Sequence, residues 1–280
     1  MESYESASPA EQLRRLVTIR ERSDVLRPVR TYWFLLLGLA VATAAYFGVW
    51  LTLAGTAVSM AMIIVPFLLL MGLVEGARDR FGVRTRRRPV GWVLYGIGGV
   101  LTIGLGVLKI QSVDYPSWLN VVGPILVFVA LAIVPLRGLW ATRGERRSTW
   151  PVVELSRPVR VSTMLIGLAI GGVIAIDAAS PVGASVALLP LLLTLVLICA
   201  YTSPIGMRRV GYAWGGRQWS AFGCVVVVAF VAAILGQATA WFRGPVAIVV
   251  GVLTVIVMTV VAWAPGTTAA GDDGAPAARA

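Results

Sequence analysis

Residues 31–74 contain no Asp, Glu, Lys or Arg. A helix of about 20 apolar residues is long enough to cross the hydrocarbon layer of a bilayer, which is about 30 Å thick. One helix over the whole stretch would reach about 66 Å, at about 1.5 Å per residue. The stretch must therefore fold back on itself, and Ala54-Gly55 is the expected turn between two membrane spans.

Long apolar runs of this kind recur along the rest of the chain. Hydrophobic residues make up 58% of the 280 residues and charged residues 13%, whereas about 25% charged residues is usual in soluble domains. The predicted spans are, in order, residues 31–53, 55–74, 90–108 and 118–136, the two runs of 161–201 on either side of Ser180-Pro181, then 219–241 and 245–263. The predicted fold class is all-α: a polytopic integral membrane helical bundle with eight transmembrane helices.

The basic residues lie on alternate connections between the predicted spans. Of the 24 Lys and Arg residues, Lys109 and Arg243 are the two that fall on the minority side. Cytoplasmic loops carry the excess of Lys and Arg, so we expect both termini in the cytoplasm. This sidedness accounts for the formal net charge of +11 without nucleic acid as a partner. We also expect anionic lipid headgroups as partners on the cytoplasmic side.

Among these cations only Lys109 is a lysine, and we attribute the excess of Arg to a GC-rich genome. The first apolar run is too long for the hydrophobic part of a cleavable signal peptide, so we expect it to remain as a span. The predicted location is the cytoplasmic (plasma) membrane of a bacterium, with a multi-pass topology.

The sequence Arg-Pro-Val-Arg occurs twice in the chain. It stands at 27–30 and at 157–160, and each copy precedes an apolar run that soon contains Gly-Leu-Ala. Further matches keep the same order, among them Pro66 with Pro190. This order favours duplication of a four-span unit, and an even number of spans makes two such repeats parallel. The alternative is that membrane-interface sequences share a common composition, since Arg-Pro-Val also occurs at 88–90.

The predicted organisation divides the chain into five segments. In order, these are a cytoplasmic N-terminal amphipathic helix (1–30), a first four-span repeat (31–140), a cytoplasmic linker (141–160), a second four-span repeat (161–263) and a disordered cytoplasmic tail (264–280). The N-terminal helix is predicted from Ser8-Pro9-Ala10-Glu11, which has the pattern of a capping box. It lies on the membrane surface, or it extends the first span into water.

Few polar side chains lie inside the predicted spans. An ionisable residue within a span is a candidate functional residue. Asp177 and Gln237 stand near the outer ends of the fifth and seventh spans, and Lys109 and Arg243 flank other outer ends. We predict an outer-face polar cluster of these four residues. In the alternative interpretation, Asp177 faces water and Gln237 forms an interhelical hydrogen bond.

Pro66 and Pro190 stand within the second and sixth predicted spans. A proline inside a helix removes a backbone hydrogen bond and bends the helix. Paired interruptions in corresponding spans can mark the binding site of a transporter. A bend that serves only helix packing is the alternative.

Several classes of chemistry have no matching residues in the sequence. The chain has no histidine, its two cysteines (Cys199 and Cys224) lie in apolar runs, and no Walker motif is present. We therefore predict no catalytic residue, cofactor or metal site. The expected function is that of a non-enzymatic accessory, assembly or regulatory membrane component. The alternative is a permease or transporter membrane subunit for an apolar or amphiphilic substrate, with a second membrane subunit or an ATPase as partner.

Overall fold

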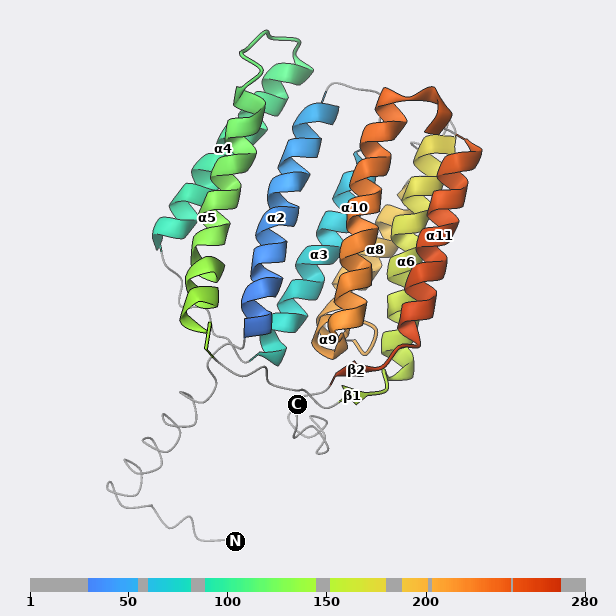
Figure 1. The fold of residues 1–280 in the computed structure, drawn as a ribbon. Helices are drawn as coiled ribbons and strands as arrows, with labels where there is room; N and C mark the ends of the chain where they lie inside the picture. The colour runs from blue at the N-terminus through green and yellow to red at the C-terminus, as the bar shows by residue number, and fades with distance from the viewer. Residues whose placement is uncertain are drawn as a thin grey trace, which may run out of the picture.

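The computed structural model describes residues 30–54, 60–81, 89–144, 152–179, 188–200, 203–242 and 244–267. They form a helical bundle with one pair of two-residue strands (Figure 1). The elements are α2 (Arg30–Leu53), α3 (Ala61–Arg80), α4 (Pro89–Ile110), α5 (Leu119–Ala141), β1 (Val152–Val153), α6 (Arg157–Ala179), α8 (Leu188–Cys199), α9 (Met207–Ala213), α10 (Gly216–Ala238), η1 (Ala240–Phe242), α11 (Pro245–Ala262) and β2 (Gly266–Thr267).

Six of the helices are long and apolar enough to cross a membrane, namely α2, α3, α5, α6, α10 and α11. The protein is therefore a helical membrane protein with six candidate spans. The remaining apolar helices, α4 and α8, lie where the third and sixth spans are predicted. The count of eight spans stays a prediction for these two helices. The predicted N-terminal amphipathic helix and most of the predicted tail lie outside the described residues.

The apolar helices run along one common axis, so the bundle has two ends (Figure 1). One end holds α9, β1 and β2, the starts of α2, α6 and α10, and the ends of α3, α5 and α11. We call it the α9 end. The opposite end holds η1, the start of α11, and the connection between α4 and α5, and we call it the η1 end.

Large apolar side chains cover the outer faces of the bundle. Val100 in α4 is 73% exposed, Val260 in α11 is 65% exposed and Leu189 in α8 is 63% exposed. Water-soluble proteins seldom expose apolar surface on this scale. These faces are suited to lipid, in agreement with the predicted bilayer environment.

The main hydrophobic core lies between α3 and the helices that follow α5. Leu69 of α3, Ile170 of α6 and Ala229 of α10 are fully buried within it. No residue of α4 or α5 belongs to this cluster, because these two helices pack mainly on α2 and on each other. The α4–α5 pair therefore stands at the edge of the bundle (Figure 1).

The two halves of the chain pack their helices in the same pairs. In residues 30–144, the first half, α2 packs most extensively against α5, less against α3, and little against α4, while α4 also packs against α5. In residues 152–267, the second half, α6 packs most extensively against α11, less against α8, and little against α10, while α10 also packs against α11. First with fourth, first with second and third with fourth are thus the partners in both halves.

Two features lie outside the predicted spans. Helix α9 forms in the connection between α8 and α10, and β1 pairs antiparallel with β2 through Val152 with Thr267 and Val153 with Gly266. The strand pair joins the predicted linker 141–160 to the beginning of the predicted tail 264–280. The chain thus returns at its C-terminal side to the point where its second half begins.

Candidate functional site

Lys109, in the last turn of α4, has its own partners at the η1 end. Its Nζ donates hydrogen bonds to the carbonyl oxygens of Leu51, at 2.6 Å, and Thr52, at 3.1 Å. These carbonyls belong to the last turn of α2, where helical carbonyls lack partners within the helix and carry partial negative charge. Lys109 therefore caps α2 and fixes α4 against it.

Two of the other predicted outer-face residues lie in helices that are not the main partners of α4. Gln237 is exposed near the end of α10, and Asp177 stands near the end of α6. Arg243 and the side chain of Asp177 lie outside what the structure describes. Helix α4 packs mainly on α5 and α2, so Lys109 is bound on the far side of the bundle from α6 and α11 (Figure 1). A cluster of all four residues stays a prediction.

The two predicted bends occupy different positions in their helices as described. Pro66 is buried and is the sixth residue of α3. Pro190 is also buried but is the third residue of α8, which is described from Leu188. The Pro190 ring lies 3.5 Å from where a Cβ on Gly172 of α6 would be, so it packs between α8 and α6.

A very close backbone contact lies at the α9 end, between α9 and the last turns of α3. A Cβ on Gly76 would lie 1.9 Å from the carbonyl oxygen of Arg208, and a Cβ on Gly211 would lie 2.0 Å from the carbonyl oxygen of Leu73. Real Cβ atoms do not approach backbone oxygens so closely. Only glycine at both positions lets the backbone of α9 lie directly on the backbone of α3.

Charged side chains surround this contact. Arg80, the last residue of α3, donates from Nη1 to the carbonyl oxygen of Trp214 at 2.7 Å, just after α9 ends. Arg208 of α9 forms an ion pair with Asp79 of α3. An arginine near the last carbonyls of a helix also interacts favourably with the helix dipole. α9 is thus attached to α3 at both of its ends.

Trp214 attaches the end of α9 to the second half of the chain. Its side chain is fully buried, and its Nε1 donates to the Thr163 hydroxyl of α6 at 3.0 Å. Its ring meets the rings of Trp219 and Phe222 of α10, each with centroids 5.5 Å away. A buried indole N–H needs such a partner, so Trp214 fixes α9 relative to both α6 and α10.

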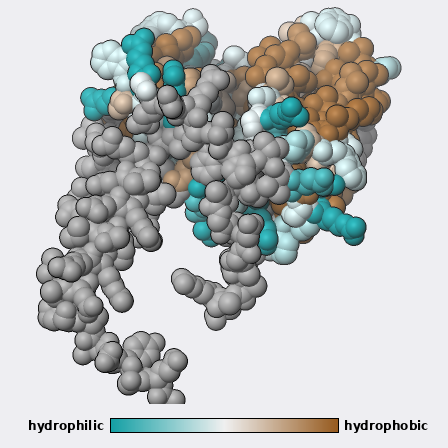
Figure 2. All heavy atoms as spheres, turned by 60° about the horizontal axis from the view of Figure 1, so that its bottom comes forward, coloured by the Kyte–Doolittle hydropathy of each residue, from teal (hydrophilic) through white to brown (hydrophobic). Residues whose placement is uncertain are grey.

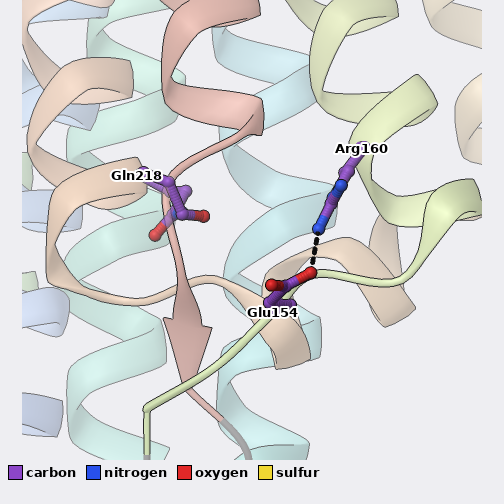
Figure 3. Close-up of polar contacts among 4 residues, drawn as sticks. Glu154, Arg160 and Gln218 are labelled. Carbon is purple, nitrogen blue, oxygen red and sulfur yellow. Dashed lines mark hydrogen bonds and ion pairs between the residues drawn. The ribbon is translucent and has the colours of Figure 1, made fainter.

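Gln218, at the start of α10, joins three segments of the second half. It is fully buried, its Oε1 accepts the Gly215 N–H at 3.0 Å, and its Nε2 donates to the carbonyl oxygen of Ala264 at 2.9 Å. It therefore caps the start of α10 and reaches the chain just after α11. Figure 3 shows Gln218 beside the strand that follows α11.

Arg160, in the first turn of α6, binds next to this network. Its Nη2 lies 2.8 Å from Oε2 of Glu154, the ion pair drawn in Figure 3. Its guanidinium carbon lies 4.9 Å from the ring centroid of Trp263, directly after α11. Such a cation–π contact adds a further link between the start of α6 and the end of α11.

The basic residues of the described part of the chain are strongly sided. Every described arginine belongs to the α9 end, whereas Lys109 lies at the η1 end; the arginines are Arg30, Arg78, Arg80, Arg137, Arg143, Arg157, Arg160, Arg208, Arg209 and Arg217. Figure 2, which brings the α9 end forward, shows hydrophilic residues gathered there and hydrophobic residues along the flank. The charge distribution divides the bundle as the sequence predicts.

The buried polar side chains among the described residues are hydroxyls and one amide. They are Thr43, Thr102, Thr142, Ser162, Thr163, Thr194, Gln218 and Thr254, and the Tyr32 phenol and the Trp214 indole are buried as well. Most donate to backbone carbonyls of their own helix, as Thr102 does to Gly98 at 2.7 Å, while the Thr43 hydroxyl has no partner among the described atoms. Within the described residues no group of three His, Cys, Asp or Glu could hold a metal ion.

The α9-end residues were not singled out in the sequence, although two signals were present. Gly72 and Gly76 have the spacing with which helices approach closely, and Gly211 stands in a connection that is otherwise apolar or basic. Neither signal identifies the segment that packs against these glycines. Comparison of the chain with protein-family models, with curated proteins and with solved structures found no match.

Proposed function

We propose that the protein is a non-enzymatic, polytopic component of the bacterial cytoplasmic membrane with an accessory, assembly or regulatory role. The observation that supports this proposal is the chemical nature of the protein's buried polar groups. Among the described residues these groups are hydroxyls, one amide and one indole, mostly bonded to the chain's own backbone. None of them is an Asp, Glu, Lys or Arg side chain, and such groups support helix packing.

In this proposal the bundle has eight spans and both termini lie in the cytoplasm. Helices α4 and α8 are the two further spans. Each lies in the chain between two candidate spans that run in the direction opposite to its own. The arginines of the α9 end support a cytoplasmic position for that end. Anionic lipid headgroups are the proposed contacts of the exposed arginines there, such as Arg209 and Arg217.

The proposal also includes two parallel four-helix repeats. Equivalent helices pack as partners in both halves, as described above. An acidic residue precedes both copies of Arg-Pro-Val-Arg at the same distance, since Asp24 stands six residues before Arg30 and Glu154 six residues before Arg160. Arg30 and Arg160 both place their guanidinium group over an aromatic ring, that of Phe34 and that of Trp263.

A permease or transporter membrane subunit is the second candidate. It is favoured by the attachment of the two halves through α9, since alternating access moves one repeat against the other. The buried residues of the described part include no Asp, Glu, Lys or Arg, which favours an apolar or amphiphilic substrate. Coupling would then come from a separate ATPase.

Purification from the native membrane tests the first proposal. The chain, tagged at its C-terminus and extracted in mild detergent, is expected to bring a membrane partner in stoichiometric amount. An ATPase as that partner would instead support the transporter subunit. Reconstitution of the purified chain alone in vesicles with a fluorescent amphiphile separates the candidates further, because transport by the chain alone would contradict a purely accessory role.

A further inference from the structure

Helix α9 joins the two halves of the molecule, and its construction differs from that of the other contacts between them. The helices of the first half that meet the second are α3, which packs on α6, α8 and α10, and α2, which packs on α10. Those contacts lie within the hydrophobic core. The contact of α9 with α3 combines glycine backbone packing with charged groups at the end of the bundle.

The charged part of this contact is accessible to water. The side chains of Arg208 and Asp79 are 46% and 39% exposed. Ions screen an exposed pair, and water competes for its hydrogen bonds, so it forms and breaks readily. Arg80 adds a hydrogen bond to the carbonyl oxygen of Trp214. The exposed ion pair therefore adds little to the energetic barrier to release, which comes mainly from the buried packing of α9 on α3.

The two flanks of α9 are suited to movement. Gly206 precedes the helix and Gly215 follows Trp214, and both have extended backbone conformations. Glycine lacks a Cβ and changes its backbone angles at low cost, which makes it a common hinge residue. The helix itself has seven residues, so it moves as one short unit between these two glycines.

We propose that α9 is a releasable latch that closes the joint between the two halves at the α9 end. The latch consists of α9 with Gly76, Asp79 and Arg80 of α3. When α9 lies on α3, Met207 and Val210 are buried, and Met207 lies against Gly72 of α3. When α9 leaves α3, these side chains become exposed, and the ends of α3 and α10 are free to separate. Such a joint serves a regulated accessory component as well as a permease.

A buried cysteine at position 210 reports the state of the latch. The test uses the full chain in lipid nanodiscs, with Cys199→Ser and Cys224→Ser, and measures labelling of Val210→Cys by a water-soluble thiol reagent. Val210 is fully buried, so labelling requires α9 to leave α3. A parallel chain with Ala229→Cys, fully buried in α10, reports opening of the whole bundle. The latch predicts faster labelling at position 210 than at position 229.

Gly76→Ala is expected to open the latch, because its Cβ would collide with the Arg208 carbonyl. We expect labelling at position 210 to rise about 10- to 100-fold, the size of effect typical of overpacking. Labelling at position 229 is expected to stay unchanged. Gly223→Ala is the matched control, since a Cβ there meets nothing within 4 Å, and it should change neither rate.

Two results would overturn the latch. If Gly76→Ala leaves labelling at position 210 unchanged, α9 is a fixed part of the bundle. If it accelerates labelling at positions 210 and 229 equally, the variant has destabilised the whole protein and α9 does not open by itself. An independent readout is salt, since weakening of the Arg208–Asp79 pair should accelerate labelling at position 210 and Asp79→Asn should remove that dependence.

Discussion

The second half of the molecule is fastened at the α9 end in a way that the described part of the first half is not. In the second half, Gln218 and Arg160 connect the start of α10 and the start of α6 to the end of α11. In the first half, α5 is held to α2 by side-chain packing such as that of Trp33 on Gly138. Helices that pack in the same pairs thus differ in the side-chain contacts that join them at the α9 end.

The largest difference between the halves is expected when a buried tryptophan is removed. Trp214→Ala leaves a large cavity and removes the indole N–H that donates to the Thr163 hydroxyl, at a cost of about 3–5 kcal/mol. Trp33→Ala in the first half should cost much less, since Trp33 is only half-buried at the edge of α2 and α5. Thermal unfolding of both variants in detergent checks this order. Equal losses would mean that the first half is fastened as firmly as the second.

Gln218→Leu is expected to loosen the end of α11. The substitution leaves the Gly215 N–H and the Ala264 carbonyl without their partner, at a cost of about 1–3 kcal/mol. Gln237→Leu on the same helix is the control, and its exposed side chain predicts a change within about 0.5 kcal/mol. Hydrogen exchange of residues 261–267 should accelerate in Gln218→Leu alone. Unchanged exchange would show that β1 and β2 suffice to hold this segment.

The two copies of Gly-Leu-Ala predict effects of opposite sign. A Cβ on Gly167 would lie 2.5 Å from Cβ of Met258, so Gly167→Ala should overpack α6 against α11 and cost about 1–3 kcal/mol. A Cβ on Gly38 meets nothing within 4 Å, so Gly38→Ala should stabilise by about 0.4–1 kcal/mol through lower unfolded-chain entropy. Melting temperatures of the two variants measure this directly. Losses of the same size would contradict the open space around Gly38.

The smallest effect is expected for Glu154→Gln, which removes the ion pair with Arg160. The Glu154 side chain is 88% exposed, so the loss should be below about 1 kcal/mol and should disappear at high salt. Unfolding at low and high ionic strength measures it. A loss that persists at high salt would show that the pair matters through its geometry, for instance by orienting Arg160 over Trp263.

The sequence predicted the positions of the apolar helices well because their length and polarity are set by the bilayer. The uncharged stretch 31–74 does contain α2 and most of α3, and the arginine distribution matches the two ends of the bundle. The α9-end contacts could not be predicted in the same way. They join residues far apart in the chain, as Arg80 joins Trp214 and Gln218 joins Ala264, and no periodic pattern encodes such a pairing.

The predicted outer-face cluster shows the limit of reasoning from polarity alone. Lys109 and Arg243 are the two cations on the minority side, and the predicted cluster gives them Asp177 as an acidic partner. The structure gives it carbonyl oxygens of α2 instead. Backbone groups at a helix end attract a cation as an acidic residue does, but they leave no trace in the sequence. Pro190 is a similar case, since its effect depends on where α8 begins.

Lys109 also makes the protein a convenient reporter of its own topology. It is the single lysine of the chain, so an amine-reactive reagent that cannot cross membranes has one side-chain target. Modification from the outside of intact cells, and not from inverted vesicles, would identify the η1 end as the external one. Because its Nζ is held by two carbonyl oxygens, the rate of acylation would also record how often α4 separates from α2.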